Sequence, residues 1–176
     1  MAATVTIRPA TLADLPRVDA LLGRSYPRLL KPDYPPSILA AVVPAISRAK
    51  PTLLASGTYW LAEAGGAILA CGGWTAAAPT DGDRAAGTGY VRHVATDPDH
   101  TRRGHARAVM ARAMEQAAGW GIGRLECLST RTAVPFYASL GFRWQEELDV
   151  AIGGAIPFPA VRMTARLRTE PVRGSA

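Results

Sequence analysis

The stretch that decides the fold is residues 94–110, VATDPDHTRRGHARAVM. A β-rich run over 90–96 leads through Pro98 into a polar loop whose only glycine, Gly104, stands where a helical pattern begins. Apolar residues recur there at spacings of three and four, which predicts an amphipathic helix over 104–120. The predicted buried face consists of Ala106, Val109, Met110, Ala113, Met114 and Ala117. A strand, a short loop and a long helix therefore follow one another.

The predicted helix start is strongly basic. Arg102, Arg103 and Arg107 surround it, and Arg112 follows in the same helix. The first amides of a helix have no partner within the helix, and together with the positive end of the helix dipole they bind anions. This pattern predicts a site for a polyanion such as a pyrophosphate, with a solvated basic helix end as the alternative.

The order of residues at this helix start resembles motif A of the GCN5-related N-acetyltransferases, R/Q-x-x-G-x-G/A. Here the motif runs Thr101-Arg102-Arg103-Gly104-His105-Ala106. Thr101 stands where the family usually has Arg or Gln, and Ala106 fills the slot for a small residue. The resemblance implies that acetyl-coenzyme A binds here, with no metal. The implied binding residues are Arg102, Arg103, Gly104, His105 through its amide, Ala106 and Arg107.

The same resemblance gives a role to the end of the strand over 90–96. In the family this strand bulges, its amides pair with the pantetheine arm, and one amide polarises the thioester carbonyl. By resemblance that role belongs to Val94, Ala95 and Thr96. An amide in this position would stabilise the developing oxyanion.

A second family signature, A-x-x-F-Y-x-x-x-G-F, lies in the run TRTAVPFYASLGFR. The signature is matched by Ala133, Phe136, Tyr137, Gly141 and Phe142. The run predicts a helix over 133–140 that ends at the glycine, followed by a strand. By resemblance Tyr137 protonates the departing thiolate, and Thr130 stands where the family often has an asparagine that contacts the pantetheine. Ala133 and Phe136 belong to the implied coenzyme A site.

An amine acceptor is mostly protonated at neutral pH, so a base or a water chain must remove a proton before the amine attacks. The candidate bases are His93, Glu126 and Glu63, each on a predicted strand. Strand alternation places His93 opposite Arg92 and Val94, so only one of these sets can face the acceptor. His93 is the first choice, and a packed histidine without a chemical task is the alternative.

The N-terminal third predicts one strand and two helices. The strand covers 4–8, and the first helix runs from Leu12 to Gly23 after a capping box formed by Thr11 and Asp14. Four prolines between residues 26 and 36 predict irregular structure. Ser37 is the expected N-cap of a helix over 38–49 that Pro44 kinks or splits.

The remaining segments predict mostly strands. Residues 58–63 and 67–74 flank a Gly-Gly turn and indicate an antiparallel hairpin, whereas 76–89 is a glycine-rich loop. A strand over 124–129 follows the long helix, and two C-terminal strands meet at the turn Gly153-Gly154. This order predicts an α/β (α+β) fold with a mixed sheet of six or seven strands and about four helices. The fourth and fifth strands should be parallel and splayed around the cofactor.

Bulk properties favour one domain of 176 residues. We expect a substrate-side region over about 1–57, a cofactor-binding core over about 58–142 and a C-terminal hairpin over about 142–168. Cys71 and Cys127 stand alone, so we expect buried thiols in a reducing compartment and a cytoplasmic protein without a membrane segment. The net charge of +6 is not accompanied by an aromatic and basic stacking platform, which argues against nucleic acid as a partner. The loop before the long helix has a single glycine, which excludes a dinucleotide-binding fold.

Together, the two signatures predict an acyl-CoA-dependent N-acetyltransferase. The acetyl group would pass to a primary amine of a small molecule or a protein by direct attack in a ternary complex. The acceptor and the acyl-chain preference are left open by the sequence, and a homodimer is compatible with it. The alternative function is a non-catalytic acyl-CoA sensor or interaction module with the same fold.

Overall fold

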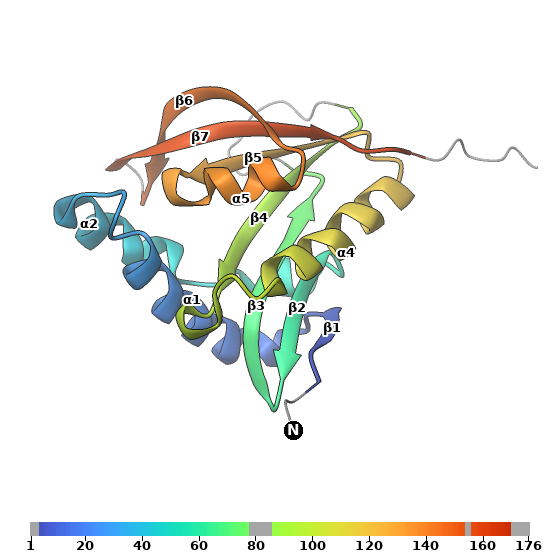
Figure 1. Cartoon of the computed structure of the whole chain (residues 1–176), viewed down its shortest axis with the longest axis horizontal. Coiled ribbons are helices and arrows are strands. Elements are labelled where there is room, and N and C mark those ends of the chain that lie inside the picture. The colour runs from blue at the N-terminus through green and yellow to red at the C-terminus, as the bar shows by residue number, and fades with distance from the viewer. Residues whose placement is uncertain (1–3, 78–85, 154–155, 170–176) are drawn as a thin grey trace, which may run out of the picture.

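The computed structural model describes residues 4–77, 86–153 and 156–169 and contains one mixed sheet (Figure 1). Within these residues the sheet has seven strands in the order β1-β2-β3-β4-β5-β7-β6. The strands are β1 (Thr6–Pro9), β2 (Tyr59–Ala64), β3 (Ala67–Thr75), β4 (Thr88–Thr96), β5 (Arg124–Thr130), β6 (Arg143–Ile152) and β7 (Ile156–Arg166). The helices are α1 (Leu15–Leu29), α2 (Pro36–Ile46), α3 (Pro51–Leu54), α4 (His105–Gly119) and α5 (Val134–Ser139), with 3-10 turns η1 (Leu12–Asp14), η2 (Pro98–His100) and η3 (Arg131–Ala133).

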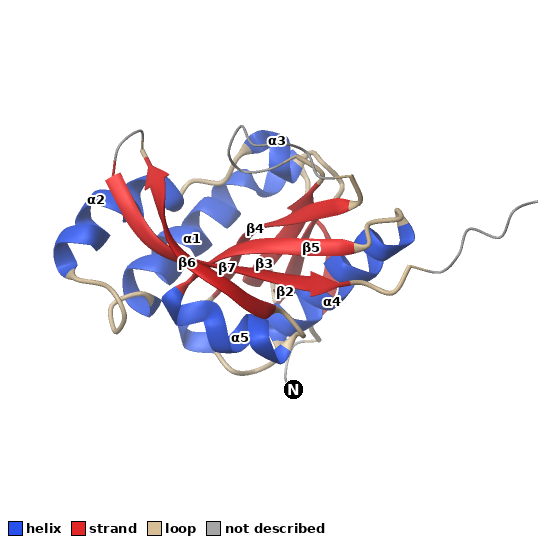
Figure 2. Ribbon diagram, turned by 90° about the horizontal axis from the view of Figure 1, so that it is seen from above, coloured by secondary structure: helices blue, strands red, loops and turns tan. Residues whose placement is uncertain are grey.

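The helices cover the two faces of the sheet separately. Seen from above, α1, α2 and α3 gather on one side of the strands, and α4 and α5 lie on the other (Figure 2). Val91 of β4 packs with Met110 of α4, whereas Ala95 of β4 packs with Leu21 of α1. The central strands are therefore buried on both faces, as their near-continuous apolar sequence requires.

β4 and β5 separate after a short parallel ladder. They pair only at Thr88 with Arg124, Gly89 with Leu125 and Tyr90 with Glu126, while every other neighbouring pair in the sheet is antiparallel. Beyond Tyr90 the two strands diverge, and β5 continues its pairing with β7 up to Thr130. The predicted mixed sheet with a splayed parallel pair is confirmed.

The long helix after β4 is confirmed, because α4 buries the face that the periodicity indicated. Val109, Met110, Ala113 and Ala117 are fully buried, and Gly104 is the N-cap residue. The backbone of Gly104 has φ of 83°, a left-handed conformation that glycine adopts without strain. The chain can therefore turn sharply from the loop into the helix.

The first helix differs from its predicted bounds. Residues 12–14 form the 3-10 turn η1, and α1 then runs past Gly23 and through Pro27 to Leu29. Thr11 still donates its backbone N–H to Asp14 Oδ2, at 2.9 Å, as the capping box required. Ser25 before Pro27 and Leu30 after it are buried, which favours the helix although Pro27 cannot donate a hydrogen bond.

The second helix also differs, because α2 begins at Pro36 and ends at Ile46. Proline is well suited to a first helical position, so Pro36 replaces the expected start after Ser37. Pro44 lies in the last turn and does not split the helix. The four-residue helix α3 was not predicted, and Gly154 of the predicted C-terminal turn lies outside the described residues.

Candidate active site

A cavity of about 860 Å³ occupies the gap where β4 and β5 separate. Its walls come from six places: α1, the end of β4, the loop and first turn of α4, the end of β5, η3 and α5. Most residues expected to hold the cofactor or act on it line this cavity. They are Val94, Ala95, Thr96, Arg102, Gly104, His105, Ala106, Arg107, Thr130, Ala133, Phe136 and Tyr137. Arg103 and His93 do not line it.

The N-terminus of α4 faces the cavity with unpaired amides and positive charge. Arg102 and Gly104 both have positive φ, 59° and 83°, which folds the loop back over the first turn of the helix. A Cβ added to Gly104 would meet no atom within 4 Å, so the space beside its Cα is open. Arg102 and Arg107 line the same region. This set suits a diphosphate group.

The turn that leads into this loop is fixed by Asp97 at the end of β4. Its carboxylate accepts from Arg24 Nη2 at 2.8 Å and from the backbone N–H of Asp99 at 2.9 Å. Burial alone would raise the pKa of Asp97, but these bonds and His100 lower it to about 2. The carboxylate is therefore ionised at neutral pH and holds the loop in place.

β4 bulges at His93 and Val94, where the structure agrees with the family-based expectation. Arg92 pairs with Gly73 and Ala95 pairs with Cys71, so two residues of β4 lie opposite one residue of β3. His93 has φ of 41°, which is uncommon for a residue with a side chain. A bulge of this kind redirects the backbone groups of the strand.

The bulge is anchored through the carbonyl of His93. That oxygen accepts from the hydroxyl of Tyr59 at 2.7 Å and from Cys71 Sγ at 3.6 Å, both on the β3 side of β4. In a trans peptide the following N–H points the opposite way, so the Val94 amide points away from the side chains of Tyr59 and Cys71. Sequence reasoning did not identify these two anchors.

The side chain of Tyr137 forms part of the cavity wall, and its hydroxyl keeps its proton. The side chain is 6% exposed, and none of the described residues forms a hydrogen bond with the hydroxyl. Phe136 and Phe142 pack edge-on against the ring, with centroids 5.3 Å away in each case. Burial, with smaller contributions from Cys127 and Tyr26, raises the pKa of Tyr137 well above its ordinary value. The hydroxyl is a neutral donor at physiological pH.

None of the three candidate bases lines the cavity. Burial, with the positive charges of Arg92 and Lys50, lowers the pKa of His93 to about 4. Glu63 is ion-paired at the opposite end of the sheet, and Glu126 is ion-paired with arginines of β5 and β7. Their partners are Arg8, Arg17, Arg124 and Arg162.

A model of the acetyltransferase (GNAT) family matches residues 23–142, which is more than half of the chain. The chain belongs to the GNAT acetyltransferase family. No curated protein matches it. The family match includes the end of β4, the start of α4 and the signature that contains Tyr137.

Solved GNAT structures share the fold at low sequence identity. A GCN5-related N-acetyltransferase from Rhodopseudomonas palustris is 20% identical, with a TM-score of 0.74 over 95% of this chain and 98% of that one. PaiA N-acetyltransferase from Thermoplasma acidophilum, in complex with coenzyme A, is 14% identical, with a TM-score of 0.69 over 93% and 99%. The ribosomal-protein-S18-alanine N-acetyltransferase of Escherichia coli is 15% identical, with a TM-score of 0.64 over 98% and 100%.

The α1 wall of the GNAT cavity was missing from the sequence prediction. It consists of Ser25, Tyr26 and Leu29, in the part of α1 beyond its predicted end, and of Leu30, which directly follows α1. The spacing of three and four continues through these residues and was the available signal. Pro27 obscured it, because an internal proline normally ends a helix.

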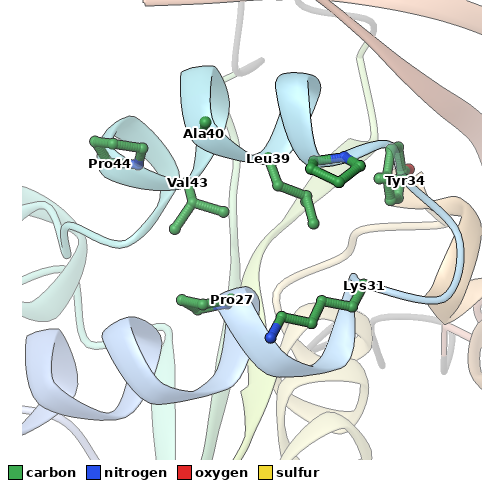
Figure 3. Close-up of a pocket in the computed structure, with 8 residues that line it drawn as sticks. Pro27, Lys31, Tyr34, Leu39, Ala40, Val43 and Pro44 are labelled. Carbon is green, nitrogen blue, oxygen red and sulfur yellow. The ribbon is translucent and has the colours of Figure 1, made fainter.

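A second hollow, of about 570 Å³, lies between α1 and α2 of this GNAT fold (Figure 3). Its lining is apolar except for Tyr34 and Lys31. The side chain of Lys31 runs along the α1 side in the close-up. The hollow contains none of the residues of either family signature. Among the described residues, no cluster of His, Cys, Asp or Glu could hold a metal, and no helix is long and apolar enough to span a membrane.

Proposed function

We propose that the protein is an N-acetyltransferase that moves the acetyl group of acetyl-CoA to a primary amine in a ternary complex. One observation carries this proposal: the basic start of α4, the bulge of β4 and the hydroxyl of Tyr137 all border one cavity. These are the three elements that anion binding, carbonyl polarisation and thiolate protonation require. Family membership and the coenzyme A complex of PaiA support it.

The residues that would hold acetyl-CoA are those expected from the motifs. The amides of Gly104, His105 and Ala106, with Arg102 and Arg107, suit the diphosphate, and Arg103 adds positive charge from outside the lining. The amides of Val94 to Thr96 suit the pantetheine arm. Thr130 accepts the N–H of Ala133 at 3.2 Å, which fixes the turn beside Phe136. The bound thioester would supply the acyl carbon that the amine attacks.

The chain itself contributes a polarising amide and a proton. The Val94 N–H would stabilise the oxygen of the thioester carbonyl while a C–N bond forms and the C–S bond breaks. Tyr137 would give its proton to the thiolate, which leaves as the thiol.

A protonated amine loses two protons in all, one before it attacks and one as the amide forms. No carboxylate lines the cavity within the described residues, and the pKa of His93 is too low for an efficient base at neutral pH. We therefore favour a bound water as the first proton acceptor, with the imidazole of His93 as the second candidate. The two buried free thiols, Cys71 and Cys127, are consistent with a reducing compartment, and we propose a cytoplasmic location.

A screen of primary amines with acetyl-CoA, followed by release of free thiol, tests the proposal. We expect acetyl-CoA to raise the melting temperature, nicotinamide cofactors to leave it unchanged, and at least one amine to accelerate thiol release. Binding of acetyl-CoA without turnover on any amine would instead favour the sensor function. Absence of both binding and turnover would refute the assignment of the cavity.

A further inference from the structure

Arg92 lies at the vertex of the cleft, the point where β4 and β5 separate. The last parallel pair is Tyr90 with Glu126, so Arg92 is the next β4 residue on the same face of the sheet. Val91 packs against α4, which places Arg92 on the opposite face, with α1 and α3. The bulge begins immediately after Arg92.

The guanidinium of Arg92 is partly buried, and no described residue neutralises it. Across the described part of the chain, it forms no hydrogen bond, and no carboxylate oxygen lies within 4 Å. Arg8, by contrast, is less than one third exposed and is bonded to both Asp14 and Glu63. None of the Arg92 nitrogens is among the buried side-chain atoms without a partner, so the guanidinium is still open to an anion from outside the described residues.

The charged neighbours of Arg92 add to the positive potential. Lys50 lies just before α3, and its positive charge lowers the pKa of the His93 imidazole, as the charge of Arg92 also does. Glu126, on the neighbouring strand β5, is engaged by Arg124 and Arg162. Burial lowers the pKa of Arg92, with no acidic group acting against it.

The reaction cavity is equally short of negative charge. Its lining contains Arg102, Arg107, His100 and His105 but neither Asp nor Glu. A polycationic acceptor would therefore meet no counter-charge in the described walls. Arg92 is not itself part of the cavity lining, so it would attract an anionic acceptor from beside the cavity.

We propose that the acceptor is an amine that also carries a carboxylate, and that Arg92 binds this carboxylate at the vertex. This inference rests on the proposed function and narrows its substrate class to amino acids and related amino carboxylates. The planar guanidinium can hold a carboxylate through two parallel hydrogen bonds, which orients the adjacent amine toward the bulge. The transfer forms the amide C–N bond, releases the coenzyme A thiol and leaves the carboxylate unchanged.

Matched acceptor pairs test the assignment. Each amino acid is compared with the amine that lacks its carboxylate, such as phenylalanine with phenethylamine and leucine with isopentylamine. We expect kcat/KM to favour the amino acid in each pair that is turned over. Arg92→Gln should lower kcat/KM for the amino acid on the order of 10²-fold, mainly through KM, and leave the simple amine unchanged. Arg92→Lys should restore part of the loss.

Controls separate this assignment from a general effect on the enzyme. Arg166 is an exposed arginine on β7, and Arg166→Gln should change neither the KM for the amino acid nor the KM for the simple amine. The Kd of acetyl-CoA should be the same in all variants. Equal use of both members of each pair, or an unaffected Arg92→Gln variant, would overturn the role of Arg92 while transferase function stands.

If no amine is turned over, the proposed function fails. Calorimetry of N-acetyl amino acids with the coenzyme A complex then decides, and equal Kd values for wild type and Arg92→Gln reject the carboxylate site.

Discussion

The hydroxyl of Tyr137 is the donor expected to neutralise the leaving thiolate. Tyr137→Phe removes that hydroxyl and little volume, and no described hydrogen bond depends on it. We expect kcat to fall on the order of 10²-fold, with the Kd of acetyl-CoA and the free energy of unfolding almost unchanged. Steady-state kinetics and urea unfolding measure the two effects. A wild-type kcat in Tyr137→Phe would mean that water, and not Tyr137, protonates the leaving thiolate.

Gly104 leaves open the space in which a diphosphate would sit. Gly104→Asp should weaken acetyl-CoA binding by at least about 10²-fold, because a carboxylate would occupy and repel the anion site. Gly104→Asn is the matched control, since asparagine has the same size and tolerates positive φ without the charge. Calorimetric titration should find clearly tighter binding to the Asn variant. Equal weakening by both would mean that backbone strain, and not charge, dominates.

His93 affects stability through its buried imidazole. Its pKa falls from 6.5 to about 4 on folding, so the unfolded chain binds a proton more readily between these values. The free energy of unfolding should therefore decrease as the pH drops from 6.5 toward 4, by up to about 1.4 kcal/mol per pH unit from this group, and stay level above 6.5. Urea unfolding of wild type and His93→Gln measures this. An identical slope in the variant would contradict the burial of a neutral imidazole.

At the level of elements, Tyr34 joins the loop before α2 to the turn that precedes α5. Its hydroxyl accepts the N–H of Arg131 at 2.8 Å and donates to the carbonyl of Pro159 at 2.7 Å. Its ring stacks on Phe158, with centroids 4.6 Å apart. The side chain of Thr132 donates to Asp33 beside it, at 2.7 Å. The turn η3, which borders the cavity, is thus held by the loop between α1 and α2.

Tyr34→Phe keeps the stack and breaks both bonds of the hydroxyl. We expect the KM for acetyl-CoA to rise several-fold, together with a loss of roughly 1 to 3 kcal/mol in stability, because two backbone groups lose their partner. Thr58→Val, which removes a buried hydroxyl bonded to the carbonyl of Trp74 far from η3, is the control for stability alone. A KM unchanged in Tyr34→Phe would show that η3 keeps its position without this contact.

Local patterns predicted some elements well and others poorly. α4 was predictable because one periodic face and one glycine agree on its start. The bounds of α1 and α2 were not, since Pro27 and Pro44 lie inside helices that tertiary burial maintains. The bulge of β4 was expected only from family resemblance, and its anchors, Tyr59 and Cys71, come from strands whose register the sequence does not encode locally.

For the molecule as a whole, the splay of β4 and β5 decides where chemistry can occur. The sequence indicated the parallel pair, because a helix connects these strands, and the two signatures indicated the residues on either side of the gap. The position of Arg92 at the vertex was not predictable, because it depends on where the ladder stops. If the proposed role of Arg92 holds, both the cofactor side and the acceptor side of the sheet are basic.

The most direct test of the account follows the acetyl group itself. Acetyl-CoA labelled with ¹³C in the acetyl group is incubated with the protein and the amine panel, and products are analysed by mass spectrometry. The account predicts a labelled amide in an amount equal to the thiol released, formed by wild type and strongly reduced in Tyr137→Phe. Label found only in free acetate, or amide formed at the same rate without the protein, would contradict it.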